Sequence, residues 1–396
     1  MVALKFIFWA SIGIVFYSYL GYALLMLLLV KLKSVFFRSP AYGKGRQINL
    51  PYVTLIVSAY NEEDFIEKKI KNSLELRYPD GLIKLIFITD GSDDRTCEII
   101  EKYPVIKALH QPERKGKVAA MNRAMQYVET PIVVFSDANT LLNPDSIKEI
   151  VKHYEDPLVG GVAGEKKVIS GIETMAAGAG ESLYWKYESL LKKLDSDLYT
   201  VVGAAGELFS LRTLLYENTD EQIVIEDFVQ SLRICMKGFV IRYEPNAYAM
   251  ESSSSSMKEE EKRKIRICAG AFQAMILLKG LFNIFKYPLL SFEFISHRVL
   301  RWTLCPVCLG LILLSNITLT ILKGGRYFAL LLLVQGVFYL LSLVGWYFAN
   351  RNIRVKALYI PYYFLFMNIS VFIGFKRFLK KQQSVLWEKS ARGQYA

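Results

Sequence analysis

The chain has 396 residues, which is long enough for two or three domains. It is 53% hydrophobic, which is too apolar for an ordinary soluble protein, yet 22% of its residues are charged. A net charge of +12 would suit nucleic acid or an anionic membrane surface. No nucleic-acid-binding motif is present and the basic residues gather around apolar runs, so we expect membrane lipid as a partner and no nucleic acid.

The first apolar run, residues 6–30, is uncharged and exceeds the ~20 residues that a helix needs to span a bilayer. We interpret residues 1–30 as an uncleaved transmembrane anchor, because no small-residue cleavage site follows the run. Five basic residues follow between Lys31 and Arg46, and only Lys5 precedes the run. The positive-inside rule therefore predicts an integral protein of the plasma or inner membrane, with the next domain in the cytosol.

Residues 51–273 alternate short β-branched runs with amphipathic stretches, which is typical of an α/β sheet covered by helices. The pattern predicts strands over 53–58, 82–89, 105–109 and 132–136. It predicts helices over 62–76, from 93 onward, and over 117–128, 173–194, 226–237 and 256–274. Ser256 and Glu259 have capping-box spacing at the start of the last of these helices.

The remaining chain returns to apolar sequence. Residues 274–301 mix basic and aromatic residues and predict a helix in the membrane interface. Residues 302–375 hold two good spanning segments, 303–322 and 327–350, and a weaker one, 357–375, which contains Pro361. Three spans would leave the basic tail, 376–396, outside, whereas its charge favours the cytosol. We predict a cytosolic tail, with 357–375 re-entrant.

Polar side chains follow three of the predicted strands. Glu62 follows the first strand, Asp90 the second, and Asp137 and Asn139 the fourth. In open α/β sheets ligands bind at the carboxyl ends of the strands. Carboxylate and amide oxygens there would repel a phosphate unless a divalent cation intervened, so the pattern indicates a metal ion together with a nucleotide. Each cluster alone is equally explained by an Asx turn.

Four segments in this order resemble the motif series of family 2 glycosyltransferases: VSAYNEE at 57–63, TDGSDD at 89–94, RKGKVAAMNRA at 114–124 and IED at 225–227. The chain is most similar to the membrane-bound branch that includes cellulose, chitin-oligosaccharide, hyaluronan and poly-N-acetylglucosamine synthases. The resemblance implies a GT-A-like, Rossmann-like α/β domain that transfers a sugar from a UDP-sugar with inversion. It also implies a glycan or polyprenyl-linked lipid as acceptor, in cell-surface polysaccharide assembly.

The resemblance assigns roles to individual residues. The donor-binding set is Ala59, Asn61, Glu62, Asp90, Lys117, Asp137 and Arg266. Mg²⁺ or Mn²⁺ would be held by Asp137 and Asn139, where asparagine replaces a second aspartate. Asp227 would be the catalytic base, kept ionised by the start of its helix. The acceptor-binding set is Gly203, Gly206, Glu207 and Glu226.

Purely structural explanations compete with these functional roles. Glu226 and Asp227 also favour a helix start, 203–206 would suit a tight turn, and Glu181 and Glu188 are typical of a solvated helix face. The clearest departure from the family lies at 263–267, where Arg263 and Ile267 replace the glutamine and tryptophan of processive synthases. We therefore predict one or a few sugar additions. The alternatives are a processive synthase and a catalytically silent component that only binds sugar nucleotides.

Overall fold

The computed structural model describes residues 1–36, 50–169, 176–252, 256–351, 353, 355–382 and 384–386, without the side chains of 169, 176–183 and 356. In this part of the chain, eight strands form one mixed sheet in the order β3-β2-β1-β4-β7-β6-β8-β5. β3, β2, β1 and β4 run parallel, while β7 is antiparallel to both of its neighbours. The strands are β1 Val53–Ala59, β2 Ile83–Thr89, β3 Lys107–Leu109, β4 Ile132–Asp137, β5 Leu141–Leu142, β6 Val159–Ile169, β7 Leu208–Arg212 and β8 Val240–Ser252.

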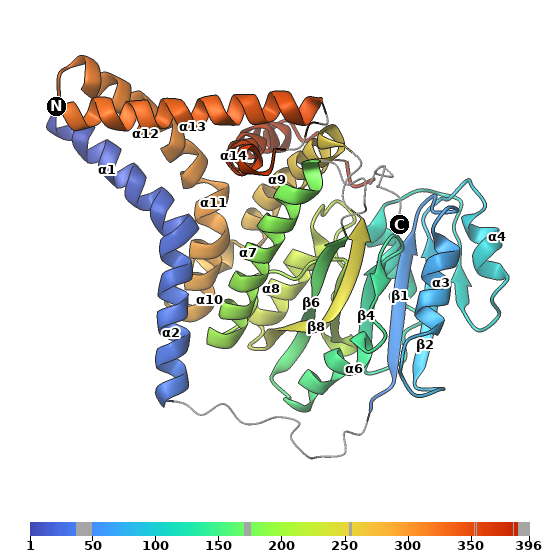
Figure 1. Ribbon diagram of the computed structural model, residues 1–396. Helices are drawn as coiled ribbons and strands as arrows, with labels where there is room; N and C mark the ends of the chain where they lie inside the picture. Colours follow the sequence, from blue (N-terminus) through green and yellow to red (C-terminus); the bar gives the residue numbers. More distant parts are fainter. Residues whose placement is uncertain are drawn as a thin grey trace.

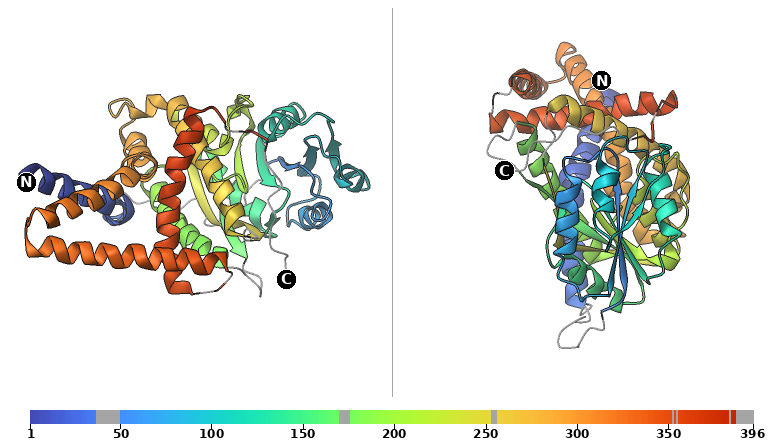
Figure 2. Two further views of the ribbon diagram at one scale, coloured as in Figure 1. Left: turned by 90° about the horizontal axis from the view of Figure 1, so that it is seen from above. Right: turned by 90° about the vertical axis from the view of Figure 1, so that its right-hand side faces the viewer.

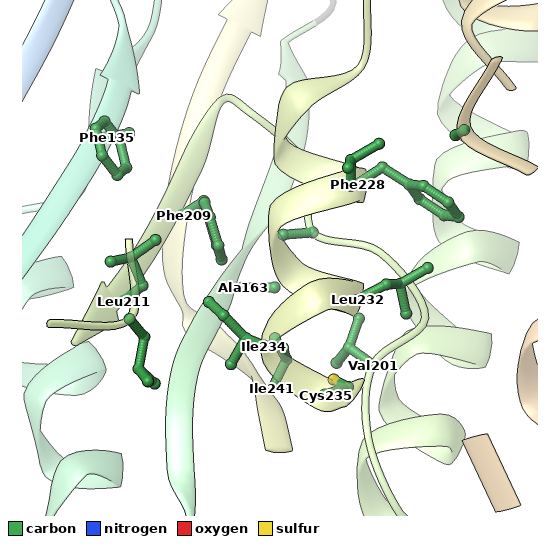
Figure 3. Close-up of a cluster of buried hydrophobic side chains, with 14 of the residues drawn as sticks. Phe135, Ala163, Val201, Phe209, Leu211, Phe228, Leu232, Ile234, Cys235 and Ile241 are labelled. Atoms are coloured by element: carbon green, nitrogen blue, oxygen red, sulfur yellow. The ribbon is translucent and has the colours of Figure 1, made fainter. Parts of the chain in front are cut away.

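Helices cover both faces of the sheet, which confirms the α/β class (Figure 1). Alternate residues of β1 point to opposite sides, so Leu55 packs with α3 and α6 while Ile56 packs in the cluster that contains α5 and α8. Figure 3 shows the second cluster, in which Phe209 and Ile241 of the sheet lie on one side of α8, while Phe228 and Leu232 of α8 point away from the sheet. These helices are α3 Ile66–Leu74, α4 Thr96–Glu101, α5 Lys117–Met125, α6 Ser146–Val151, α7 Ala176–Leu198, α8 Glu226–Met236 and α9 Met257–Leu277.

The sequence placed the first four strands within two residues of their observed ends, but several other details differ. α3 begins at Ile66 because the amides of Glu62 and Glu63 are held by Thr96 and Asp94, outside any helix. Strands β6, β7 and β8 were not predicted. β6 reads VGGVAGEKKVI, whose glycines and lysines hide the alternation expected of a strand. The Ser256 cap is confirmed, since its hydroxyl accepts from the amide of Glu259.

The predicted interfacial helix over 274–301 is instead a chain of short pieces. α9 ends at Leu277, and Asn283 then closes a turn by accepting from the amides of Phe285 and Lys286. Pro288 starts the next helix. The pieces are η4 Lys279–Phe282, α10 Pro288–Glu293, the π-helical turn η5 Phe294–Val299 and α11 Leu300–Trp302. They stack beside α7 and the N-terminal helix (Figure 1).

Within the described residues, four helical stretches are long and apolar enough to cross a membrane: Val2–Phe36, Leu304–Ile321, Arg326–Asn350 and Ala357–Leu379. The first is α1 Val2–Phe16 and α2 Tyr22–Phe36, joined by the π-helical turn η1 Tyr17–Gly21, and the others are α12, α13 and α14 (Lys356–Leu379). α14 is one continuous helix through Pro361. It crosses α13 and does not lie alongside it (Figure 2).

Candidate active site

A cavity of about 1140 Å³ opens at the carboxyl ends of β1 and β4 and extends to the short helices over residues 279–302, which we call the interface helices. Parallel pairing aligns the strand ends, because Ser58 lies opposite Asp137 and Ala59 opposite Thr89. Of the residues predicted for the donor and the metal ion, Glu62, Lys117, Asp137, Asn139 and Arg266 line this cavity. The predicted acceptor residues Gly203, Gly206, Glu207 and Glu226 line it with Asp227.

Ala59, Asn61 and Asp90 do not line the cavity in this structure. Ala59 is buried within the sheet, and the Asn61 amide pairs with Asp93 at 2.6 Å. The Asp90 carboxylate is 1% exposed and accepts from the backbone amides of Lys115 and Gly116 at 3.0 and 2.7 Å. Asp90 thus fixes the loop that leads into α5 and places Lys117 at the first residue of that helix.

Lys117 lies at the centre of the charged residues in the cavity. Its Nζ is 2.8 Å from an Asp137 carboxylate oxygen and 3.1 Å from an oxygen of Glu226. Burial lowers the pKa of Lys117, but the carboxylates of Asp137, Glu226 and Asp227 outweigh burial and hold that pKa well above its usual value. Burial raises the pKa of Asp137, opposed mainly by Lys117. The Lys117 ammonium group therefore neutralises part of the negative charge of these three carboxylates.

A lysine that sequence reasoning missed fixes the end of the strand that carries Asp137. Lys69 of α3 is fully buried and donates to the hydroxyls of Ser136 and Thr140 at 2.7 and 3.3 Å. Burial lowers the pKa of Lys69 to about 7. The two hydroxyls flank Asp137 in the chain, so Lys69 fixes the end of β4. A lone lysine on the apolar face of the 66–74 helix is the sequence signal that could have found it.

Asp227 is the second residue of α8 and faces the cavity. One carboxylate oxygen accepts from the amide of Phe228 at 2.8 Å. Burial, and then the neighbouring carboxylate of Glu226, raise the pKa of Asp227 to about 7, although Lys117 opposes the rise. The start of α8 was expected to help keep Asp227 ionised, and burial acts against this effect, so the carboxylate titrates near neutral pH.

The 203–207 loop approaches Asp227 closely. A Cβ on Gly206 would lie 2.9 Å from Nζ of Lys117 and 3.3 Å from a carboxylate oxygen of Asp227. Gly203 has φ +88°, and a Cβ there would meet the Phe228 ring at 2.0 Å. Glu207 is held by Nζ of Lys166 at 2.5 Å. The two glycines thus allow the loop backbone to lie against the start of α8, with Gly203 beside Phe228 and Gly206 beside Asp227.

The altered segment of α9 also faces the cavity, which Arg263, Arg266 and Ile267 all line. Arg263 pairs with Glu260 at 2.9 Å, one turn earlier on the same helix. Burial lowers the pKa of Arg266, while Glu226 opposes the shift. The two arginines therefore face the cavity that holds Asp137 and Asp227.

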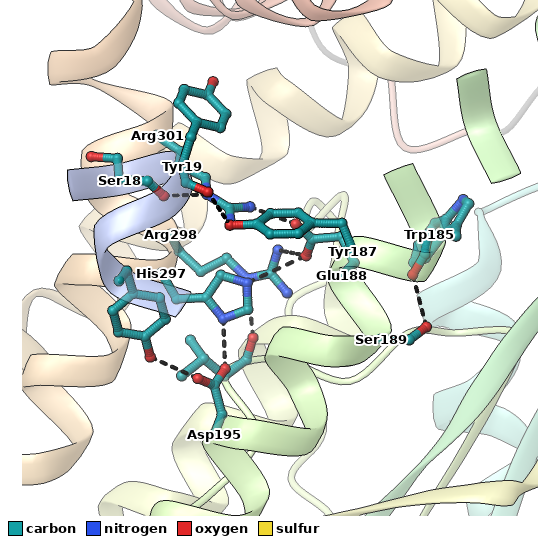
Figure 4. Close-up of polar contacts among 12 residues, drawn as sticks. Ser18, Tyr19, Trp185, Tyr187, Glu188, Ser189, Asp195, His297, Arg298 and Arg301 are labelled. Atoms are coloured by element: carbon teal, nitrogen blue, oxygen red, sulfur yellow. Dashed lines mark hydrogen bonds and ion pairs between the residues drawn. The ribbon is translucent and has the colours of Figure 1, made fainter. Parts of the chain in front are cut away.

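Glu188 was predicted to lie on a solvated face and is instead 1% exposed (Figure 4). Its carboxylate pairs with Arg301 at 2.5 Å, with Arg298 at 2.7 Å and with His297 at 3.3 Å. The other His297 nitrogen is 2.6 Å from Asp195. The prediction failed because sequence does not show that α7 packs between the sheet and the interface helices; the side chain of Glu181 lies outside the described residues.

Residues 54–221 match the model of the family described as Glycosyl transferase family 2. The chain carries a family 2 glycosyltransferase domain. It is 26% identical over 267 residues to the poly-beta-1,6-N-acetyl-D-glucosamine synthase of Staphylococcus aureus, a match that covers 63% of this chain and 62% of the relative. It is 30% identical over 183 residues to the beta-monoglucosyldiacylglycerol synthase of Trichormus variabilis, covering 44% of this chain and 37% of the relative. The chain thus spans less than two thirds of either relative.

The fold is also similar to that of a solved structure. A mannosyltransferase from Pyrobaculum calidifontis, determined in complex with GDP-Man and Mn²⁺, superposes with a TM-score of 0.70 at 20% identity. The similarity covers 96% of this chain and 99% of that one. The predicted GT-A-like fold with flanking apolar helices is therefore confirmed.

The glycosyltransferase domain offers few ligands for a metal ion. Among the described residues, no group of three or more His, Cys, Asp or Glu is placed to hold one. Asp137 and Asn139 both line the cavity and supply two hard oxygen atoms. This matches what Mg²⁺ takes from proteins when phosphates and water complete its shell. Because Asp137 is paired with Lys117, the residues fit an ion that arrives together with the phosphates of a donor.

Proposed function

We propose that the protein is a membrane-bound, inverting glycosyltransferase that moves a sugar from a UDP-sugar to a glycan or lipid-linked acceptor in cell-surface glycan assembly. The observation that carries the proposal is the placement of Asp227 beside Lys117, with Asp137 and Arg266 in the same cavity. A carboxylate near neutral pKa suits proton removal, and the cations suit a diphosphate.

In this proposal Asp227 accepts the proton of an acceptor hydroxyl as that oxygen attacks the anomeric carbon. The bond to the UDP oxygen breaks on the opposite side, so the configuration inverts and an α-linked donor gives a β-linked product. Lys117 and Arg266 would stabilise the negative charge that develops on the leaving diphosphate. A divalent ion held by Asp137 and Asn139 would add Lewis-acid stabilisation of the same charge.

The donor class is tested by incubating purified protein with UDP-glucose, UDP-N-acetylglucosamine, UDP-galactose and GDP-mannose and measuring nucleotide release with Mg²⁺, with Mn²⁺ and with EDTA. We expect release of UDP from one UDP-sugar in the presence of a divalent ion. Release from GDP-mannose alone would contradict the donor assignment. Binding of UDP without release from any donor would favour the catalytically silent alternative.

Asp137→Ala is expected to weaken UDP binding in Mn²⁺ and to leave UDP binding in EDTA nearly unchanged, because the carboxylate acts through the ion. Calorimetric titration of UDP in both buffers measures the difference. Asp145→Ala is the control, because Asp145 is a partly exposed aspartate that immediately precedes α6. Equal weakening in EDTA would show that Asp137 does not act through a metal ion.

A processive polysaccharide synthase is the second candidate. The staphylococcal relative is named as a polymer synthase, and Trp185 and Trp302 line the cavity that Ile267 also lines. These tryptophans offer aromatic surface that Ile267 lacks. We propose that the products are short. In an assay with labelled donor and native membranes, the labelled product should then appear in the organic-extractable fraction. High-molecular-weight polymer without intermediates would instead assign the processive activity.

We also propose that the glycosyltransferase domain and the C-terminal tail lie together in the cytosol, with α14 on the same side. Residues 384–386 line the cavity of the domain, so an even number of α12, α13 and α14 crosses the membrane. The turn between α12 and α13 lies beside the N-terminus, since the Phe328 and Phe8 rings are 5.4 Å apart. α14 is the least apolar and most buried of the candidate spans, so α12 and α13 are the pair that crosses.

This arrangement predicts the labelling of introduced cysteines. In a Cys97→Ser background, a cysteine replacing exposed Lys380 should resist an impermeant thiol reagent on intact cells and react once the cells are opened. A cysteine replacing exposed Arg326, at the start of α13, is the matched control and should react from outside. Labelling of the Lys380→Cys protein on intact cells would place the tail outside.

A further inference from the structure

α7 brings a lysine and a tryptophan into the cavity that neither the motifs nor the ion pairs explain. Trp185, Glu188 and Lys192 follow one another at spacings of three and four, so they share one face of the helix. All three line the cavity. Glu188 already forms ion pairs with the two arginines of the interface helices. Trp185 and Lys192 remain to be accounted for.

Both of these side chains hold an unsatisfied hydrogen-bond donor. Lys192 is 2% exposed, and within the described part of the chain its ammonium group meets no acceptor. The indole N–H of Trp185 is likewise buried without an acceptor there. The two groups are close, because Nζ of Lys192 is 5.4 Å from the centre of the indole ring. One bound group with oxygen atoms could accept from both.

The neighbouring lysines do have carboxylate partners, so the lack of one is particular to Lys192. Lys166 and Lys264 lie 5.0 and 5.7 Å from the centre of the same indole ring. Lys166 pairs with Glu207 and Glu251, and Lys264 lies 3.6 Å from Glu260. Lys192 is the ammonium group of this set for which no carboxylate contact is found among the described residues. Burying an unpaired ammonium is costly, and a ligand that accepts its hydrogen bonds removes that cost.

The surroundings favour a neutral, hydroxyl-rich ligand over a phosphate. Burial lowers the pKa of Lys192, and the charges that act on it are Glu165, Glu207, Arg298 and Glu188. Glu165, the first of these, accepts hydrogen bonds from the hydroxyls of Ser189 and Tyr243 and has no ion pair among the described residues, so its charge would repel a phosphate placed at Lys192. Sugar hydroxyls can accept from Lys192 and Trp185 and also donate to carboxylates.

We propose that Lys192 and the indole N–H of Trp185 form an acceptor subsite that binds the hydroxyl oxygens of a sugar residue on a glycan acceptor. The subsite lies on α7, between the 203–207 loop and the interface helices, and is separate from the donor-binding residues. The inference rests on the proposed function for the identity of the ligand as an acceptor.

The experiment compares Lys192→Met with Lys193→Met, whose lysine is 58% exposed and pairs with Asp197 at 2.7 Å. The probe is a neutral N-acetylglucosamine tetrasaccharide, used with the donor that releases most UDP. Loss of one charge-assisted hydrogen bond is expected to raise the acceptor KM of Lys192→Met about 10- to 100-fold. The donor KM should move little, and Lys193→Met should match the wild type.

Trp185→Phe keeps the ring and removes the N–H, so it tests the subsite if Lys192→Met does not fold. We expect a smaller rise in acceptor KM, about 3- to 10-fold. An unchanged acceptor KM in both variants overturns the proposal. A rise with polyprenyl phosphate as acceptor, and none with the tetrasaccharide, would overturn it in favour of a phosphate site.

Calorimetric titration of the tetrasaccharide separates failure of the subsite from failure of the proposed function. If no donor is turned over, binding by the wild type and by Lys193→Met, with loss of binding in Lys192→Met, still supports a saccharide subsite. Equal binding by all three proteins, or no binding by any of them, contradicts it.

Discussion

Asp227→Asn is expected to reduce sugar transfer by about 10²–10⁴-fold while UDP binding remains near that of the wild type. Asparagine has nearly the volume of aspartate but cannot accept the proton of the acceptor hydroxyl. Glu221→Gln is the control, because Glu221 is an exposed acid on the segment that leads into α8. A variant that kept more than about a tenth of the wild-type turnover would exclude Asp227 as the base.

The pH profile gives a second test of the same residue. The raised pKa of Asp227, about 7, means that the carboxylate is protonated below neutral pH and cannot act as a base. The wild-type kcat/KM should therefore fall about tenfold per pH unit below pH ~7 and level off above it. The residual activity of Asp227→Asn should lack this acidic limb, and an acidic limb that persisted in the variant would belong to another group.

Glu188→Gln is expected to destabilise the folded protein by about 3–5 kcal/mol, because Arg298 and Arg301 lose the negative charge that compensates them in a buried site. Burial raises the pKa of Glu188, but the two arginines and His297 outweigh burial and hold it well below its usual value. The carboxylate is therefore ionised throughout the neutral range, and the variant removes a full charge.

Denaturant titration of the purified protein in detergent, followed by tryptophan fluorescence, measures this loss. Glu67→Gln is the matched control, because Glu67 forms an exposed pair with Lys71 on α3, and we expect its unfolding curve to overlie that of the wild type. Overlapping curves for Glu188→Gln and Glu67→Gln would mean that the buried cluster does not hold α7 against the interface helices.

The sequence predicted the parts of the fold that local pattern controls. Residues 53–58 and 132–136 are apolar or alternate between apolar and polar residues, and turn residues flank them, so both strands could be predicted. The ends of these strands then pointed to Glu62 and Asp137. Lys117 and Asp227 were found through motif resemblance, and the structure brings both into one cavity. Their roles in donor binding and proton transfer remain predictions.

Tertiary packing decided what the sequence could not show. Glu188 resembles a solvated residue until α7 is placed against the interface helices, and Asp90 resembles a cavity residue until the Lys115 loop closes over it. The raised pKa of Asp227 depends on burial and on its distance from other charges, neither of which a motif contains. Lys192 carries no motif, and its significance appears only when its partners are sought in three dimensions.

The N-terminal helix cannot be regarded as a removable anchor when a soluble form of the enzyme is prepared. The Tyr22 hydroxyl donates to Asp195 at 2.6 Å, and Arg301 donates to the backbone carbonyl of Ser18. Asp195 and Arg301 are the same side chains that hold His297 and Glu188. A chain that began at residue 50 would leave these buried groups short of partners and would expose the apolar side of α7, where Leu191 and Leu194 pack on Met26. Such a truncated chain should aggregate even with its motifs intact.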